Sequence, residues 1–365
     1  MKPVVMTLGD ICTKGSSNLA QKDLDGNSGE YEIYGASGLI KKVNFFHQEK
    51  PYIAVVKDGA GVGRTMLLPA ETSVIGTMQY IIPNEDIDIE YLYYAITYMD
   101  LSRYYMGAAI PHIYFKDYCK EKILIPDIDI QKAIAHKFRI IDGLITARQE
   151  QLAKLGELIA SRFIEMFGDP VANSKNWNIS PLLSIGYCKN GMNFHSGDNG
   201  IDIRCLGVAD FKNLSVIDGT ENLPIVSLNE LPSKDSMLKD GDIVFVRSNG
   251  NKALVGRCLL VYPHNIPTTY SGFCIRFRLT SKQVMPEYLL RVLKFDSIRK
   301  KMMGRGANIQ NLNQQILASL DIPIPPLDLQ NQFAEFVKQT DKSKYLATLC
   351  IKLLGNERMM FCDKL

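Results

Sequence analysis

An internal repeat constrains the fold of this chain more than any other feature of its sequence. The segment Ile125–Gln131 recurs 199 residues later as Ile324–Gln330, and six of the eighteen positions from 125 to 142 are identical in the second copy. Shorter matches at similar offsets pair Gly107-Ala108 with Gly306-Ala307, Val62-Gly63-Arg64 with Val255-Gly256-Arg257, and Tyr91-Leu92 with Tyr288-Leu289. A repeat of this length indicates one structural unit present twice.

Each repeat ends in a pattern that predicts a long helix. A proline and an aspartate precede apolar residues whose spacing alternates between four and three. In the first copy this seam runs from Ile134 to Met166, about 50 Å at 1.5 Å per residue, and a helix of that length needs a partner. The second copy supplies one from Leu329 to Leu354. The expected helix-pair interface comprises Ile134, Phe138, Ile141, Ile145, Leu152, Leu155, Ile159, Phe333, Phe336, Ala347 and Leu354.

Two alternatives to this helix pair stay open at the level of sequence. The second helix has another possible register, which runs through Val337, Leu346, Leu349 and Leu353. The two tails could also be separate amphipathic helices, each lying on its own domain. Equal spacing, similar length and the repeat favour an antiparallel coiled coil.

The sequence therefore predicts an α+β protein: two α/β globular domains in a pseudo-twofold repeat, separated by two long helices that form an antiparallel coiled coil. The expected boundaries are 1–125 for the first domain, 126–170 for the central helix, 171–325 for the second domain and 326–365 for the C-terminal helix. Within the domains, helices are expected at Ile89–Met99 and Pro286–Met303, and short strands separated by glycine and asparagine turns make up most of the rest.

Composition narrows the class of protein. The chain has 42 basic and 39 acidic residues, a net charge of +3, which excludes a strongly basic histone-like binder but permits a basic face. Its eight cysteines form no Cys-x-x-Cys pair and its five histidines are scattered, so we expect reduced thiols and no metal site. The sequence shows no apolar leader and no run of eighteen apolar residues. We expect a soluble, cytoplasmic protein with no membrane association.

The patterns that resemble catalytic motifs have simpler interpretations. Asp58–Thr65 is glycine-rich but lacks the Gly-Lys-Thr/Ser ending of a phosphate loop, so a tight hairpin is favoured. Asp127, Asp129 and Lys132 resemble a nuclease site, yet they lie at a helix start, where acids complement the helix dipole. No methyltransferase or hydrolase motif is found. We predict no catalytic residue in this chain.

In combination, the repeated motifs make the whole chain resemble the specificity subunit of Type I restriction–modification systems. The carrying elements are Leu8-Gly9-Asp10, the two Val-Gly-Arg turns, the Gly-Ala loop before each Ile-Pro, the two Ile-Pro-x-x-Asp-x-Gln helix starts, and Phe167-Gly168-Asp169-Pro170 with Asn176-Trp177 beyond it. The resemblance implies that each globular half reads one half of a split double-stranded DNA target and that the helices set the unread spacer.

The same resemblance implies the partners and cofactors. Two methyltransferase (modification) subunits would dock on the helices, and restriction (translocase) subunits would join that assembly. S-adenosylmethionine, ATP and Mg²⁺ would be bound by those partner subunits, and this chain would bind no cofactor itself.

Candidate DNA contacts lie in equivalent loops of the two halves, because base edges are read by side chains with paired donors and acceptors. The candidates are Lys57, His112 and Tyr114 in the first half, and Arg247, Asn249, Asn251, Lys252, Arg305, Asn308 and Gln310 in the second. Arg64 and Arg257 occur in both halves and are expected to support the scaffold. For each asparagine, a simple turn-forming role is the alternative.

Other functions remain open at this stage. An orphan DNA-binding adaptor outside restriction–modification would share the same sequence features. A self-contained nuclease or methyltransferase is disfavoured by the missing motifs, and a pure protein-interaction scaffold would show no salt-dependent, sequence-selective binding to DNA.

Overall fold

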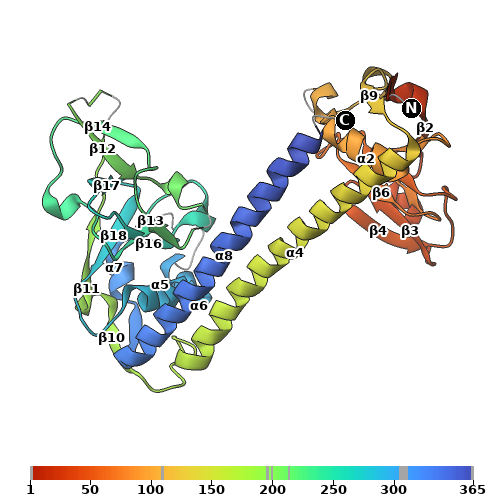
Figure 1. The fold of residues 1–365 in the computed structure, drawn as a ribbon. Helices are drawn as coiled ribbons and strands as arrows, with labels where there is room; N and C mark the ends of the chain where they lie inside the picture. Colours follow the sequence, from red (N-terminus) through yellow and green to blue (C-terminus); the bar gives the residue numbers. More distant parts are fainter. Residues whose placement is uncertain are drawn as a thin grey trace. The chain divides into compact units, whose positions relative to one another are not determined.

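The computed structural model describes residues 3–107, 111–194, 197–198, 200–212, 214–303 and 311–362. The chain divides into two compact units, Met1–Leu152 with Leu346–Leu365, and Ala153–Tyr345. Each unit contains one globular α/β region and segments of two long helices (Figure 1).

The first globular region is built on small antiparallel and mixed sheets. One sheet has the order β2-β8-β5-β6, a second has the order β4-β3-β7, and β1 pairs with β9. The strands are β1 (Val4–Thr7), β2 (Cys12–Ser16), β3 (Tyr31–Gly35), β4 (Gly38–Val43), β5 (Tyr52–Val56), β6 (Thr65–Leu68), β7 (Ser73–Val74), β8 (Met78–Pro83) and β9 (Lys122–Ile125). The helices are α1 (Leu8–Ile11), α2 (Ile89–Tyr98) and α3 (Phe115–Tyr118), with 3-10 turns η1 (Gln21–Leu24) and η2 (Leu101–Tyr104).

The second globular region repeats this plan. Its main sheet has the order β11-β18-β15-β16-β13, a second sheet has the order β14-β12-β17, and β10 pairs with β19. The strands are β10 (Asn178–Pro181), β11 (Gly186–Asn190), β12 (Ile201–Leu206), β13 (Val216–Asp218), β14 (Ile225–Leu228), β15 (Asp242–Val246), β16 (Cys258–Tyr262), β17 (Thr268–Tyr270), β18 (Cys274–Leu279) and β19 (Asp321–Ile324). The helices are α5 (Pro286–Lys294), α6 (Asp296–Met303) and α7 (Gln314–Ala318), with 3-10 turns η3 (Leu182–Ser184), η4 (Val208–Asp210), η5 (Lys234–Ser236) and η6 (Lys252–Leu254).

Strand for strand, the two regions share one topology. The central strands β5 and β15 are fully buried and pair antiparallel with β6 and β8 in the first region and with β16 and β18 in the second. In each second sheet the middle strand pairs with one antiparallel and one parallel neighbour. Only β13, at the edge of the second main sheet, has no counterpart among the described residues of the first. The sequence repeat is therefore a repeat of the fold, as predicted.

One helix covers the main sheet of each region and forms its core. From α2, Tyr91, Leu92 and Ile96 are buried in one hydrophobic cluster with Ile53 and Ile81 of the sheet. From α5, the corresponding residues are buried against the main sheet of the second region. They are Tyr288, Leu289 and Leu293. Burial of apolar side chains between helix and sheet is the main stabilising contribution to such a layer.

Two long helices, α4 (Ile128–Phe167) and α8 (Leu327–Cys362), follow the globular regions. In the second unit the end of α4 packs on the start of α8, where the rings of Phe163 and Phe167 lie 5.5 and 5.4 Å from that of Phe333. In the first unit Asp142 of α4 forms an ion pair with Arg358, close to the end of α8. The order of these contacts is that of an antiparallel pair, and Figure 1 shows α4 and α8 side by side.

The interface residues predicted on α4 fall into two groups. Phe138, Ile141 and Ile159 are buried, whereas Ile134, Ile145, Leu152 and Leu155 are half-buried. Phe138 stacks on Tyr94 of α2 at 4.8 Å, and Ile134 packs with them, so this part of the seam faces its own globular region. The seam as predicted also misses two of the deepest contacts. Phe163 and Phe167 are buried, although neither belongs to the predicted seam, which ends at Met166.

On α8 the buried stripe combines the two registers considered from the sequence. Phe333, Val337, Thr340 and Ala347 are buried, while Phe336 and Leu354 are half-buried. The rest of the alternative register is exposed: Leu346, Leu349 and Leu353 lie at 55%, 39% and 55% exposure. The alternative register is therefore wrong from Leu346 onward, and α8 carries a second apolar stripe that faces solvent.

The predicted element boundaries differ from the structure mainly in the second half. The helix expected from Pro286 to Met303 is interrupted, because Phe295 has extended backbone angles and separates α5 from α6. The glycine-rich segment after β5 is a tight hairpin as predicted, with Gly59, Gly61 and Gly63 at positive φ, where residues with a Cβ are disfavoured. The long helices begin and end within a few residues of the expected limits.

Candidate nucleic-acid interface

Each globular region brings its two candidate loops together. In the first, the backbone N–H of Ile113 donates to the carbonyl of Lys57 at 2.9 Å. In the second, the N–H of Leu312 donates to the carbonyl of Arg247 at 2.8 Å. The hairpin after the central strand and the loop before the Ile-Pro motif are therefore joined in the same way twice. The sequence placed these loops 55 to 65 residues apart.

In both halves the hairpin is also hydrogen-bonded to the residue that precedes the next strand of the main sheet, β8 or β18. The N–H groups of Lys57 and Asp58 donate to the carbonyl of Thr77 at 3.0 and 3.2 Å. Those of Arg247 and Ser248 donate to the carbonyl of Phe273 at 2.8 and 3.3 Å. Isolated bridges also link Asp58 with His112 and Ser248 with Asn311. Backbone geometry is thus shared, and only the side chains differ.

The side chains at these equivalent positions differ in chemistry. Lys57 corresponds to Arg247, Asp58 to Ser248, and His112 to Asn311. In the first half the imidazole Nδ1 of His112 contacts the carboxylate of Asp58. The ring of Tyr114, which is exposed, lies 4.1 Å from that of His112, and the ammonium of Lys116 lies 5.1 Å from the Tyr114 ring. The first half therefore presents a mixed charged and aromatic surface.

The second half presents a polar hairpin. The side-chain oxygen of Asn249 accepts the N–H of Asn251 at 2.8 Å, and the oxygen of Asn251 accepts that of Ala253 at 3.0 Å. Both asparagines therefore form turns, the role that was the alternative to reading bases. Their amide nitrogens and the side chain of Lys252, which begins η6, point to donor-rich chemistry at this tip. The guanidinium of Arg247 donates to the carbonyl of Gly272 at 3.3 Å, which limits its orientation.

Three candidate residues of the second half, Arg305, Asn308 and Gln310, lie outside the described residues. The described part of their loop begins at Asn311, which is exposed. One exposed residue beside the hairpin was missed: Phe273, 60% exposed, whose carbonyl binds Arg247. An apolar residue at the start of a strand gave no sequence signal for a surface role.

Arg64 and Arg257 have the same structural role, as expected from their repetition. The guanidinium of Arg64 donates to the carbonyl of Ala36 at 3.0 Å, and that of Arg257 donates to the carbonyl of Lys212 at 3.0 Å. Each ties the hairpin to a loop of the neighbouring sheet.

Among the residues that the structure describes, no group of three His, Cys, Asp or Glu side chains is placed to hold a metal ion. Within the same residues, no helix combines the length and apolarity needed to span a membrane.

Comparison with known proteins identifies the duplicated unit. The family model of the Type I restriction modification DNA specificity domain matches this chain twice, at residues 2–156 and 175–349. The chain belongs to this family. The two matches coincide with the two halves of the repeat, and the resemblance inferred from the motifs is confirmed.

Specificity subunits are also found among the relatives of this specificity-domain chain. The specificity subunit of the Type I restriction enzyme StySPI from Salmonella potsdam is 27% identical over 252 residues, which cover 64% of this chain and 53% of that protein. The specificity subunit of the enzyme MjaVIII from Methanocaldococcus jannaschii is 24% identical over 281 residues, covering 71% of this chain and 64% of the relative. The chain thus spans between about half and two thirds of these relatives' length.

Solved structures share the fold of the specificity-domain chain over its whole length. The S subunit of the Type I system of M. genitalium has a TM-score of 0.63 at 15% identity, with 100% of this chain and 96% of that one covered. A chain solved in work on complex assembly and conformational transition of the type I R-M system has a TM-score of 0.58 at 16% identity, with coverage of 100% and 97%. At these identities the likeness concerns the fold.

Proposed function

We propose that this chain selects the DNA target of a Type I restriction–modification complex, with each globular half reading one half of a split sequence. One observation supports this most directly: the same pair of loops is built twice on the same backbone hydrogen bonds, with different side chains at equivalent positions. A shared framework places both loop pairs alike, and different donors and acceptors would give the halves different base preferences.

The chemistry of the two loop pairs suits this role. Arg247 can form a paired hydrogen bond with a guanine edge, and the amide nitrogens of Asn249 and Asn251 can donate to acceptors on base edges. In the first half, Lys57 and the paired His112 and Asp58 offer a donor set of another geometry. We keep Tyr114, Lys252, Arg305, Asn308 and Gln310 in the proposed DNA-contacting set, because they lie in the same loops.

We assign α4 and α8 the role of the spacer between the two half-sites. The aromatic contacts of Phe163 and Phe167 with Phe333 fix the helices to each other within the second unit. Two readers held by a rigid connection bind far more tightly to a target that satisfies both than to one that satisfies either. The length of the helices would then select the number of unread base pairs.

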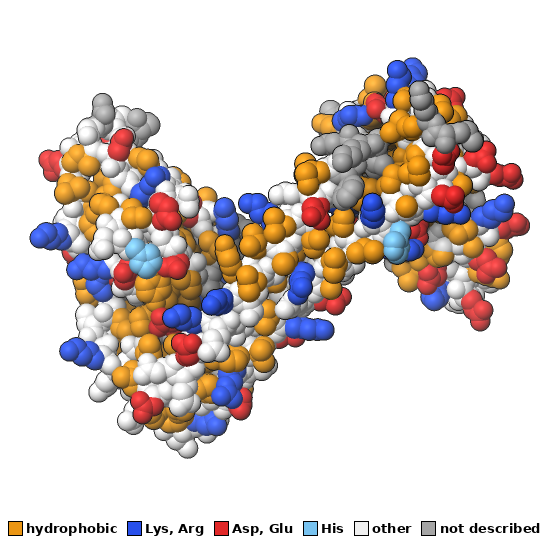
Figure 2. All heavy atoms as spheres, viewed as in Figure 1, with side chains coloured by type: hydrophobic (Ala, Val, Ile, Leu, Met, Phe, Trp, Pro, Cys, Tyr) orange, Lys and Arg blue, Asp and Glu red, His pale blue; other side chains and the backbone are white. Residues whose placement is uncertain are grey.

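The exposed stripe of α8 supports the docking of partner subunits. Leu346, Leu349 and Leu353 follow each other at helical spacing and stay exposed, and Figure 2 shows hydrophobic side chains at the surface of the helices. Contiguous exposed apolar surface is typical of protein interfaces. We propose that two methyltransferase subunits dock on the helices and that restriction subunits join this assembly.

In this proposal the chain itself is non-catalytic. S-adenosylmethionine for adenine methylation, and ATP and Mg²⁺ for restriction, would be bound by the partner subunits. The site of action is the cytoplasm, where the DNA and these partners meet.

Methylome sequencing tests the proposal. Cells that express the methyltransferase subunit are compared with and without the gene for this chain. Adenine methylation at a split motif that is lost with the gene is the expected result, and the motif gives both half-sites and the spacer. An unchanged methylome with an expressed, active methyltransferase would reject the proposal in favour of an orphan DNA-binding adaptor.

Docking is tested with two matched variants of α8. Leu346→Glu with Leu353→Glu places charges on the exposed stripe, and Lys352→Glu with Asn356→Glu places them at exposed polar positions of the same helix. The first pair should abolish co-purification of the methyltransferase subunit without changing Tm, and the second should retain it. Equal retention by both pairs would remove the stripe from the proposed interface.

A further inference from the structure

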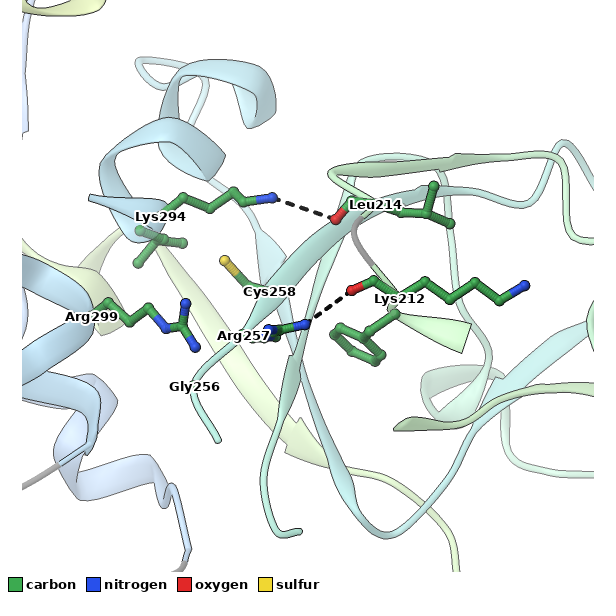
Figure 3. A pocket seen from close by; sticks show the side chains of 9 residues that line it. Lys212, Leu214, Gly256, Arg257, Cys258, Lys294 and Arg299 are labelled. Atoms are coloured by element: carbon green, nitrogen blue, oxygen red, sulfur yellow. Dashed lines mark hydrogen bonds between the residues drawn. The ribbon is translucent and has the colours of Figure 1, made fainter. Parts of the chain in front are cut away.

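A cavity in the second globular region gathers positive charge. It has a volume of about 240 Å³ and is lined by residues of the turn 256–258, the end of α5, Arg299 of α6, and the segment after η4. Its charged lining residues are Lys212, Arg257, Lys294 and Arg299, and none of the described lining residues is acidic. Figure 3 shows Arg257, Lys294 and Arg299 around Cys258, with the ends of Lys294 and Arg257 directed to the carbonyls of Leu214 and Lys212, whereas the amine of Lys212 points away.

Backbone oxygens hold each of the three converging cations in place. The ammonium of Lys294 donates to Ser215 Oγ at 2.7 Å and to the carbonyl of Leu214 at 3.4 Å. The guanidinium of Arg257 donates to the carbonyl of Lys212, and that of Arg299 donates to the carbonyl of Ala253 at 2.5 Å. The Nε of Arg299 is buried and has no hydrogen-bond partner in the part of the chain that the structure describes. The cluster is thus positioned, and it keeps unused donors.

Among the described residues, no carboxylate forms an ion pair with Arg257, Lys294 or Arg299. Burial raises the pKa of the Cys258 thiol to about 11, so the sulfur carries no charge at neutral pH. Burial lowers the pKa of Lys294, and the positive charges of Arg291, Arg299 and Arg257 lower it further. The charge of Asp341 raises the pKa of Arg291, and Asp341 is not among the lining residues. Cations held together without an anion repel one another, and a bound anion would relieve that repulsion.

The first half shows that the fold does not need this charge. Its framework arginine, Arg64, is retained, but Thr65 and Thr97 stand where the second half has Cys258 and Lys294. The two threonine hydroxyls hydrogen-bond to each other at 2.6 Å, which satisfies this position with neutral groups. The same topology therefore forms with and without the cationic cluster. The cluster is not needed for folding, and we look for a role in binding.

We propose that this cavity is a phosphate-group site, in which Arg257, Lys294 and Arg299 hold one phosphoryl group. The volume is below the roughly 300–1,000 Å³ of pockets for drug-sized ligands, so it suits one tetrahedral anion better than a whole nucleotide. Guanidinium and ammonium groups together are the usual partners of phosphate oxygens. Either free phosphate or a backbone phosphate of DNA could supply the group.

The site is connected to the candidate reading hairpin. Arg299 donates to the carbonyl of Ala253, in the η6 turn that Asn251 caps. An anion bound to Arg299 would restrict the motion of this arginine and, through its hydrogen bond to Ala253, of the turn. The site does not rest on the proposed function, because inorganic phosphate alone tests it.

Thermal unfolding of the full chain is measured with increasing inorganic phosphate at constant ionic strength, for the wild type, Lys294→Met, Arg299→Met and Lys300→Met. Lys300 is exposed on the same helix as Arg299 and gives the same change of charge outside the cavity. At ten times Kd, phosphate should raise Tm by about 3–6 °C in the wild type and in K300M. The rise should be absent in K294M and R299M. If K294M does not fold, R299M carries the comparison.

A second arm distinguishes the source of the phosphate. Binding to duplex DNA of arbitrary sequence is measured over a range of salt for the same four proteins. If a DNA phosphate occupies the site, the salt slope falls by about one in K294M and R299M relative to K300M, with no Tm rise from inorganic phosphate. Two results would overturn the site. One is that phosphate does not raise the Tm of the wild type and all four proteins have equal salt slopes. The other is that K300M loses the Tm rise, or the salt slope, as much as K294M and R299M do. Either result leaves the methylome test unaffected.

Discussion

Gln131 and Gln330 make the same three hydrogen bonds, 199 residues apart. The side-chain oxygen of Gln131 accepts the N–H of Asp88 at 2.9 Å, and that of Gln330 accepts the N–H of Met285 at 2.8 Å. Their amide nitrogens donate to the carbonyls of Asp86 and Pro126 in one case, and of Gln283 and Pro325 in the other. Both glutamines are buried. Each ties the start of a long helix to the N-terminus of the helix that covers its sheet.

Gln330→Leu should destabilise the second unit. The change removes all three hydrogen bonds of a fully buried side chain and leaves the N–H of Met285 without that partner. Each buried polar group left unpaired costs about 1–3 kcal/mol, so we expect a loss of about 2–4 kcal/mol in the free energy of unfolding. Denaturant unfolding measures it. Gln332→Leu is the control, because Gln332 is exposed and lies two residues further along the same helix. It should change the free energy of unfolding by less than about 0.5 kcal/mol.

Adjacent isoleucines of α4 provide a matched test of the helix seam. Ile141 is buried at 7% exposure, and Ile140 is 48% exposed. A carboxylate at position 141 would lose its hydration without gaining a partner, so Ile141→Glu should cost about 3 kcal/mol or more. Ile140→Glu should change the free energy of unfolding by less than about 0.5 kcal/mol. Similar effects of the two changes, measured by denaturant unfolding, would show that the seam does not run through Ile141.

An acid-sensitive ion pair holds η5 on the main sheet of the second region. A hydrogen bond from Lys189, with further contributions from Tyr187 and Arg276, lowers the pKa of Asp235 to about 2. Because the folded pKa is below that of the unfolded chain, about 3.9, the stabilisation is complete above pH 4 and is lost as pH falls toward 2. Asp235→Asn should therefore lower Tm at pH 7, and its difference from the wild type should narrow below pH 4. A difference that stays constant from pH 7 to pH 3 would contradict this assignment.

The fold was largely predictable because the same motifs occur in the same order in both copies of the repeat, so each copy supports the interpretation of the other. Patterns such as Ile-Pro-x-x-Asp-x-Gln are set by local helix starts and by a buried glutamine, so they survive in sequence. The register of α8 was not predictable, because both of its stripes are apolar and only tertiary contacts decide which one is buried. Phe163 and Phe167 were missed for a related reason, since they pack on Tyr288 and Phe333 and not along a regular heptad seam.

The sequence predicted which loops carry the candidate site, but not that these loops lie next to each other. That the hairpin of Lys57 meets the loop of Ile113 depends on backbone hydrogen bonds between segments 56 residues apart in sequence. The phosphate-group cavity left no local pattern, because Arg257, Lys294 and Arg299 come from three separate elements. Its position became visible only when the two halves could be compared strand by strand.

The equivalence of Lys57 and Arg247 predicts that specificity can be changed in one half at a time. Both side chains follow a buried central strand, and both backbone carbonyls accept the same loop hydrogen bond, which a change of side chain leaves in place. Arg247→Ala should therefore relax the base preference of one half-site only, by a discrimination of about 1–3 kcal/mol, and Lys57→Ala should affect only the other. Methylome sequencing of cells carrying each variant reads both half-sites together. Lys338→Ala, at an exposed position of α8, should leave the motif unchanged. Loss of methylation at both half-sites with either loop variant would mean that these residues support assembly and do not read bases.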